Sequence, residues 1–219
     1  MADSKQTHFS RRGFLKGAGL TAAGTLLEQA QALTAEVKSA AHEPAALGPD
    51  AVPVRLHVNG QVHAVSVEPR ETLATTLRDQ LGLTGTKVVC DRGSCSACTV
   101  WVDETPELAC MTLAVDAGGK KITTIEGLSH GETLHPVQAA FVKHDAMQCG
   151  FCTPGMVMAC ASLMKRNPHP TRPEVAHAIS GNLCRCGTYP RIFDAMDELA
   201  KNGSTNSAGL VMPRVLQEV

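Results

Sequence analysis

Alternating apolar and polar positions predict a β-hairpin where the regular pattern of the chain begins. Val54, Leu56 and Val58 alternate with polar residues, as in a strand with one buried face. Asn59-Gly60 follows, and this pair favours the type I′ turn of a two-residue hairpin loop. Residues 62–67 alternate again, so we expect a second strand paired with the first.

A helix and further short strands are expected after this hairpin. Thr72 is a suitable N-cap for a helix that runs through Gln80, with Leu73 and Leu77 on one face. Short apolar segments at 100–102 and 122–125 predict two more strands. Together these elements predict a small α+β unit over residues 53–130.

The hydrophobic spacing becomes helical after residue 131. Four helices are expected, at residues 135–146, 156–166, 172–180 and 191–202. Asn167-Pro168, Gly181 and Gly203 provide stop signals for the last three. Residues 131–203 are therefore expected to form a small helical bundle, which makes the whole chain α+β.

The N-terminal residues 1–32 are similar to a twin-arginine export signal, which predicts a periplasmic protein. Residues 10–16 read Ser-Arg-Arg-Gly-Phe-Leu-Lys and precede the mildly apolar stretch 17–27. That stretch is too short to span a bilayer, which takes about 20 residues. Ala30-Gln31-Ala32 has the A-x-A form that permits cleavage before Leu33, but the sequence does not decide whether the signal is cleaved. An ordinary basic terminus is the alternative.

Two further segments carry no regular pattern. Residues 33–52 are rich in Ala, Pro and Gly and are interpreted as a linker. Residues 204–219 form a tail without a motif, which either packs on a partner or remains disordered.

Composition argues against binding to nucleic acid and points to cysteine chemistry. Lys and Arg number 20 against 21 Asp and Glu, and aromatic residues make up 3% of the chain. A near-zero net charge offers no basic patch for phosphates. By contrast, nine cysteines all lie between Cys90 and Cys186. Disulfides are one alternative for an exported chain, but the odd count and the spacings weaken it.

The first cysteine set has the spacing of a plant-type 2Fe–2S cluster. It consists of Cys90-x4-Cys95-x2-Cys98 followed by Cys110. A tight loop can supply three thiolates if it curls around the cluster, and Gly85 and Gly93 suit such a loop. Structural zinc is the main alternative, although zinc sites usually take two ligands from each of two knuckles.

The second cysteine set combines a Cys-x2-Cys loop with a Cys-x-Cys loop. Cys149 and Cys152 precede one expected helix, and Cys184 and Cys186 lie between two others. Cys-x2-Cys alone also suits zinc or redox thiols. The two loops together predict a second 2Fe–2S cluster, with helix N-termini directed at its negative charge. Cys160 is left over and is interpreted as a small buried apolar residue.

Both sets, in this order, resemble the iron–sulfur subunit of the molybdenum hydroxylases, the xanthine oxidase and aldehyde oxidoreductase family. The resemblance covers about residues 53–202. It rests on three stretches: Cys90-Asp91-Arg92-Gly93-Ser94-Cys95-Ser96-Ala97-Cys98-Thr99-Val100, residues 148–156 from Gln148 to Met156, and residues 181–191 with Tyr189-Pro190-Arg191. The family usually has glycine where this chain has Ser96, which is expected to alter the potential or the solvent access of the cluster.

The resemblance implies a β-grasp ferredoxin domain followed by a four-helix bundle. It implies that the second cluster lies nearest a molybdopterin, in the cytosine dinucleotide form, held by a large partner subunit. Gln148 would contact the pterin, and the alternative is a polar loop residue that satisfies backbone groups. Electrons would then leave through the first cluster to an FAD-binding subunit or a cytochrome.

The expected function is therefore electron transfer within a periplasmic aldehyde oxidoreductase, with no catalytic residue on this chain. The same role in an N-heteroaromatic hydroxylase of the isoquinoline type is an alternative. A free-standing two-cluster ferredoxin carrier is a second alternative, and a zinc- or disulfide-stabilised binding module is a third.

Overall fold

The predicted hairpin is the first regular feature of the structure, a computed structural model that describes residues 47–202. Strand β1 (Val52–Val58) pairs antiparallel with β2 (Gln61–Val67). Asn59 and Gly60 join them with φ angles of 50° and 81°, as a type I′ turn requires. The hairpin prediction is confirmed. The expected export signal, most of the linker and the expected tail lie outside the described residues.

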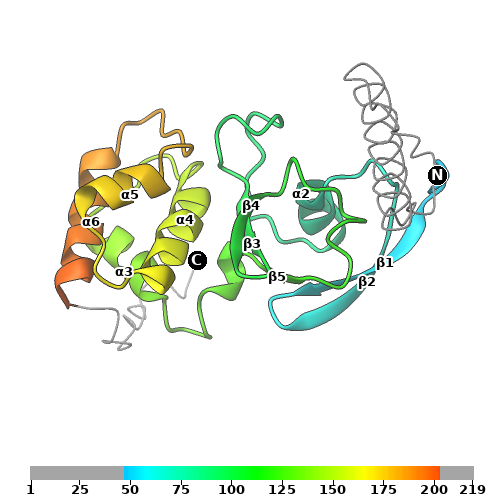
Figure 1. The fold of residues 1–219 in the computed structure, drawn as a ribbon, viewed down its shortest axis with the longest axis horizontal. Coiled ribbons are helices and arrows are strands. Elements are labelled where there is room, and N and C mark those ends of the chain that lie inside the picture. The colour runs from blue at the N-terminus through cyan, green and yellow to red at the C-terminus, as the bar shows by residue number, and fades with distance from the viewer. Residues whose placement is uncertain (1–46, 203–219) are drawn as a thin grey trace, which may run out of the picture. The chain divides into compact units, whose positions relative to one another are not determined.

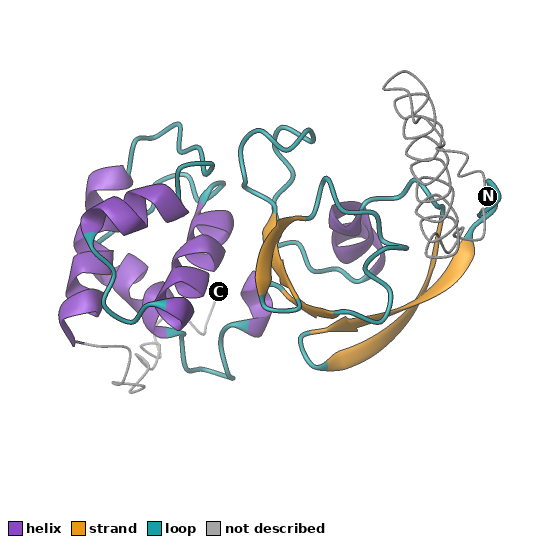
Figure 2. Ribbon diagram, viewed as in Figure 1, coloured by secondary structure: helices purple, strands orange, loops and turns teal. Residues whose placement is uncertain are grey.

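Five strands form one mixed sheet (Figures 1 and 2). The other three are β3 (Thr99–Val102), β4 (Thr105–Leu108) and β5 (Lys121–Thr123). The strand order is β2-β1-β5-β3-β4, in which β1 and β5 run parallel and every other pair is antiparallel. The fold class is α+β, as predicted.

Two details of the sheet differ from the sequence prediction. β4 was not expected, because its Thr-Pro-Glu-Leu sequence lacks an apolar alternation, yet it pairs along one edge with β3. Ile125 was expected on a strand and instead starts the 3₁₀ turn η2 (Ile125–Gly127). β5 ends at Thr123, and the next backbone N–H, that of Thr124, donates to the Asn59 side chain at 2.9 Å.

The predicted helix after Thr72 is present but changes its winding. Thr72 caps α2 (Leu73–Thr75) by accepting the Thr75 backbone N–H. The chain then continues as a π-type turn, η1 (Thr76–Gln80), closed by a hydrogen bond from the Leu81 N–H to the Thr76 carbonyl. Leu73 and Leu77 are fully buried and complete the core beneath the sheet.

Four helices follow, near the predicted positions: α3 (Pro136–Lys143), α4 (Thr153–Arg166), α5 (Arg172–Ala178) and α6 (Tyr189–Asn202). α3 and α5 begin with capping boxes and a proline in the first turn. α4 starts three residues before the predicted Met156, since Pro154 also suits a first turn. Phe141, Met156 and Met196 lie in the core that the helices share.

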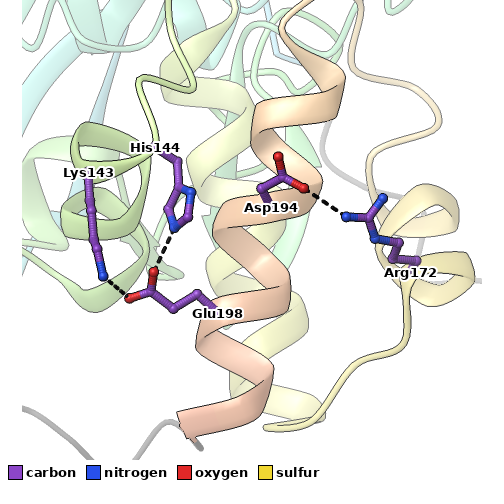
Figure 3. A network of polar contacts seen from close by, with 5 residues as sticks. All are labelled: Lys143, His144, Arg172, Asp194 and Glu198. Carbon is purple, nitrogen blue, oxygen red and sulfur yellow. Dashed lines mark hydrogen bonds and ion pairs between the residues drawn. The ribbon is translucent and has the colours of Figure 1, made fainter.

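Ion pairs attach α6 to its neighbours on two sides, as Figure 3 shows. Glu198 accepts from Lys143 at 2.6 Å and contacts His144 at 2.7 Å, both at the end of α3. On the other side, Arg172 at the start of α5 contacts Asp194 at 2.8 Å. Because these side chains are partly exposed, each pair is expected to add at most about 1 kcal/mol to stability.

A tryptophan joins the sheet to the helices. Trp101 on β3 is 8% exposed, and its Nε1–H donates to the Met158 carbonyl of α4 at 3.0 Å. Lys165 of α4 lies over the indole ring, 5.9 Å from its centroid, and pairs with Glu104 at 2.8 Å. The sheet and α4 therefore pack as one unit. None of the helices in residues 47–202 combines the length and hydropathy needed to cross a bilayer.

Candidate metal centres

The first cysteine set lies on a tightly curled loop before β3 and on the segment after β4. Cys95, Cys98 and Cys110 are buried, whereas Cys90 is partly exposed. The loop turns through residues with positive φ, at Asp91 (51°), Gly93 (72°) and Ser96 (53°). Such left-handed residues let a short loop surround a compact group of atoms. The backbone therefore provides the curl that the spacing predicted.

Backbone N–H groups of this loop point at sulfur. The Ser94 N–H lies 3.3 Å from Cys90 Sγ. Hydrogen bonds from the Arg92 backbone and then from the Cys95 side chain lower the pKa of Cys90 to about 7. Burial raises the pKa of Cys98 to about 12. In this loop the thiolate form is thus favoured at Cys90 and disfavoured at the buried Cys98.

The role expected for Gly85 is wrong. Its N–H donates to Glu126 Oε1 at 2.8 Å, not to a sulfur-containing site. A Cβ at this position would lie 2.4 Å from Ile125 Cγ2, so glycine allows the close approach of η2. Gly93, by contrast, lies within the cysteine loop beneath Met111.

The second cysteine set lies where three helices begin or end. Cys152 is the N-cap of α4, and Cys184 and Cys186 lie between α5 and α6. Cys149 and Cys186 are exposed, and the other two are partly buried. A hydrogen bond from the Phe151 backbone, followed by contact with the Cys186 side chain, lowers the pKa of Cys149.

The pKa values of the two partly buried thiols of this set are shifted in opposite directions. Burial raises the pKa of Cys152 to about 12. Burial also raises that of Cys184, but hydrogen bonds with Thr188 outweigh it and bring the pKa to about 7. The Cys184 Sγ and the Thr188 hydroxyl lie 3.3 Å apart.

The thiols of each set interact in pairs. Side-chain contacts join Cys90 to Cys95 and Cys98 to Cys110 in the first set. In the second set they join Cys149 to Cys186 and Cys152 to Cys184. Within residues 47–202, no three metal-binding side chains surround a position for one ion. Two pairs of thiols are the donor set of a binuclear 2Fe–2S centre, in which each iron takes two protein ligands.

Both cysteine sets open into one cavity of about 530 Å³. Cys90 and Cys95 of the first set line it, together with Cys149, Cys152 and Cys184 of the second. The Leu183 N–H, one residue before Cys184, donates to the Cys95 carbonyl at 3.1 Å. The two sets are thus neighbours in space although they belong to different parts of the chain.

The remaining predicted residues lie as follows. Gln148 is exposed and immediately precedes Cys149, at the outer edge of the second set. Cys160 is fully buried in α4, and burial raises its pKa to about 12. It belongs to the shared helical core, as its interpretation as an apolar residue predicted.

Sequence reasoning missed two residues that support the second set. Asn182 is 5% exposed, and its Nδ2 donates to the Ser96 carbonyl at 3.0 Å. The Tyr189 hydroxyl accepts the Cys184 N–H at 2.8 Å and donates to the Asn182 carbonyl at 2.9 Å. Both residues lie within the quoted motif, but their partners follow only from the tertiary structure.

The fold and the two paired thiol sets define a two-cluster iron–sulfur protein, and comparison with known proteins agrees. A family model described as "2Fe-2S iron-sulfur cluster binding domain" matches residues 56–115. A second, described as "[2Fe-2S] binding domain", matches residues 124–197. These ranges contain, respectively, the first and the second cysteine sets.

Several characterised proteins are similar over most of their length. The aldehyde oxidoreductase iron-sulfur-binding subunit PaoA of Escherichia coli is 41% identical over 206 residues, which is 87% of this chain and 88% of PaoA. The nicotine 6-hydroxylase small subunit of Paenarthrobacter nicotinovorans is 46% identical, covering 72% of this chain and 95% of its own length. A chain of quinoline 2-oxidoreductase from Pseudomonas putida 86 superimposes with a TM-score of 0.67 at 45% identity, covering 71% of this chain and 99% of that one.

The chain belongs to the 2Fe–2S iron–sulfur subunits of the molybdenum hydroxylases. It is an electron-transfer subunit of an oxidoreductase.

Proposed function

We propose that this chain transfers electrons in a periplasmic aldehyde oxidoreductase through two 2Fe–2S clusters. Cys90, Cys95, Cys98 and Cys110 hold one cluster, and Cys149, Cys152, Cys184 and Cys186 hold the other. The observation that carries the proposal is the arrangement of eight thiols as two sets of two pairs, of which five thiols, drawn from both sets, line one cavity. In this proposal the first cluster belongs to a β-grasp domain and the second to a four-helix bundle, as the family resemblance implies.

The second set is the side on which electrons enter. Cys149 and Cys186 are exposed there, next to Gln148. Phe151 and Leu183, both more than half exposed, add apolar surface at the rim of the cavity. Exposed apolar side chains beside exposed metal ligands favour a surface that a partner covers. The partner in this proposal is a large subunit that holds molybdopterin, in the cytosine dinucleotide form, with Gln148 as a pterin contact.

The first set is the side on which electrons leave. Cys90 is the least buried of its four thiols and lies on the outer part of the loop. Electrons taken from the substrate on the large subunit pass through the cluster of the second set and then through that of the first. They reach an FAD-binding subunit or a cytochrome.

An aldehyde is the proposed substrate class of the complex. The name of the PaoA relative supports it, and the 87% coverage of this chain extends beyond the two cluster-binding ranges. Oxidation of an N-heteroaromatic compound is the second candidate, because the nicotine 6-hydroxylase and quinoline 2-oxidoreductase relatives carry names of that kind. Turnover assays of the purified complex with an aldehyde and with a quinoline separate the two.

Iron analysis and electron paramagnetic resonance test the cluster assignment. The chain purified without oxygen should contain about four irons, and dithionite should produce two inequivalent signals. Cys184→Ser should remove one signal only. The matched control Cys160→Ser should keep both, because Cys160 lies in the core of α4 and belongs to neither cysteine motif. About two irons or none in the wild-type chain contradicts the proposal.

Two simpler observations distinguish this function from the competing ones. A zinc- or disulfide-stabilised binding module is colourless, whereas a two-cluster protein absorbs visible light. A free-standing carrier purifies alone, whereas the proposed subunit purifies with a large molybdenum-containing chain.

A further inference from the structure

The carbonyl of Ser96 lies where the two cysteine loops meet. Ser96 follows Cys95 directly and has a left-handed backbone, with a φ of 53°. Its carbonyl oxygen accepts the Thr99 hydroxyl at 2.7 Å within its own loop and Asn182 Nδ2 at 3.0 Å from the second loop. A buried side-chain amide thus joins the loops that carry the two sets.

Tyr189 completes this connection on the other side of Asn182. Its hydroxyl donates to the Asn182 carbonyl at 2.9 Å and accepts the Cys184 N–H at 2.8 Å. One phenol therefore fixes both the residue that reaches the first loop and a thiol-bearing residue of the second set. The hydrogen bonds form a continuous chain from Ser96 through Asn182 and Tyr189 to Cys184.

Two glycines lie so close to Ser96 that neither position has room for a side chain. A Cβ on Gly155 would lie 2.3 Å from the Ser96 carbonyl oxygen. A Cβ on Gly181 would lie 2.9 Å from Ser96 Oγ. The two glycines therefore let the second loop and α4 approach the first loop until they touch Ser96.

We propose that Asn182 and Tyr189 are positioning residues that lock the second cysteine loop onto the first and so set the distance between the two clusters. The inference rests on the proposed function, since it assumes that both sets bind 2Fe–2S clusters. Electron transfer between two centres slows steeply as their separation grows. Loss of the lock should therefore slow the transfer between the clusters while each cluster stays bound by its own cysteines.

Two variants remove different parts of the lock. Asn182→Asp keeps the shape of the side chain but replaces the amide donor with a carboxylate oxygen that faces the Ser96 carbonyl. Tyr189→Phe removes only the hydroxyl and leaves the Cys184 N–H and the Asn182 carbonyl without their shared partner. Asn167→Asp is the matched control, because Asn167 caps the far end of α4 and contacts Glu174.

The measurements use the intact complex, with iron content and melting temperature recorded for every variant. Magnetic coupling between the two reduced clusters reports their separation, and rapid-freeze kinetics give the rate of transfer between them. In both lock variants we expect about four irons, weaker coupling and a transfer rate about tenfold lower, the scale typical for residues that orient metal ligands. Asn167→Asp should keep the wild-type coupling and transfer rate, although its carboxylate beside Glu174 should lower the melting temperature.

The outcomes separate the lock from the proposed function. Wild-type complex without two signals contradicts the proposed function itself. Two signals, with coupling and transfer rate unchanged in Tyr189→Phe, overturn the lock alone. A third outcome is that iron content falls together with the melting temperature, while molecules that keep both clusters have normal coupling. That outcome assigns Asn182 and Tyr189 a purely structural role and also overturns the lock. If Asn182→Asp does not fold, Tyr189→Phe decides.

Discussion

Replacement of Gly155 by alanine tests the close approach of α4 to the first cysteine loop. Gly155 lies in the first turn of α4, and an added Cβ would lie 2.3 Å from the Ser96 oxygen. The next nearest atoms, at 3.0 and 3.1 Å, are the oxygen and carbon of the Ala97 carbonyl. All three are backbone atoms, so no flexible side chain can move aside. Either the helix or the cysteine loop must shift.

The expected magnitude follows from two opposing effects. In an open helix, alanine is more favourable than glycine by about 0.8–1 kcal/mol. Here the Cβ is about 1 Å short of ordinary van der Waals contact. Overpacking of this kind typically costs about 1–3 kcal/mol. The difference between the two is about 0–2 kcal/mol. Because the clash is with backbone atoms, we expect Gly155→Ala to lower the free energy of unfolding by an amount in the upper half of this range and to disturb the hydrogen bond between Asn182 and Ser96.

Urea unfolding of the cluster-loaded chain, followed by circular dichroism and by visible absorbance, measures the effect. Gly48→Ala is the control, because an added Cβ there meets no atom within 4 Å. A Gly155→Ala chain that is more stable than the wild type, with unchanged cluster spectra, would show that α4 does not approach the loop as closely as described.

Two further changes test the contacts that hold the helices in place. Trp101→Phe removes the donor to the Met158 carbonyl and should lower the free energy of unfolding, measured by urea titration, by about 1 kcal/mol. An unchanged free energy of unfolding would contradict this contact. Glu198→Gln should cost at most about 1 kcal/mol at pH 7, because the pair is partly exposed. Hydrogen bonds from Lys143 and then His144 lower the pKa of Glu198 below 4.5, so the difference should persist above pH 4.5 and vanish as the pH falls through the lowered pKa. Urea titrations between pH 5 and pH 3 measure the loss, and a difference that grows as the pH falls through this range refutes the sign.

The sequence predicts those elements whose signals are local. The Asn59-Gly60 turn and the Thr72 cap are encoded by two or three adjacent residues, and both are present. β4 has no such signal, because its pairing with β3 depends on a partner strand and not on its own alternation. The first turn of α4 was missed because Pro154 and Gly155 suggest a loop, although proline suits a helix start and this glycine is required by a neighbouring loop.

In the candidate site, too, the sequence predicts the local features and misses those that depend on tertiary packing. The spacing of the eight cysteines predicts two sets, since ligands of one centre must converge from short loops. It does not predict how the sets meet, because Asn182 and Ser96 are far apart in the sequence and become partners only when the helices pack on the sheet. Glycine positions show the same limit. Gly93 and Gly85 suited a cluster loop equally from sequence, but only Gly93 lies in it.

The unequal exposure of the two sets has a consequence for how the subunit works. Three thiols of the first set are buried by this chain alone, so the protein itself largely fixes the environment of that cluster. Cys149 and Cys186 are exposed, so the environment of the second cluster is incomplete until another surface covers them. Because solvent exposure is one of the factors that set the reduction potential of an iron–sulfur cluster, assembly should change the potential of the second cluster more than that of the first. In the electron path that we propose, docking of a large subunit would therefore tune the step by which electrons enter, while this chain alone would largely fix the environment of the step by which they leave.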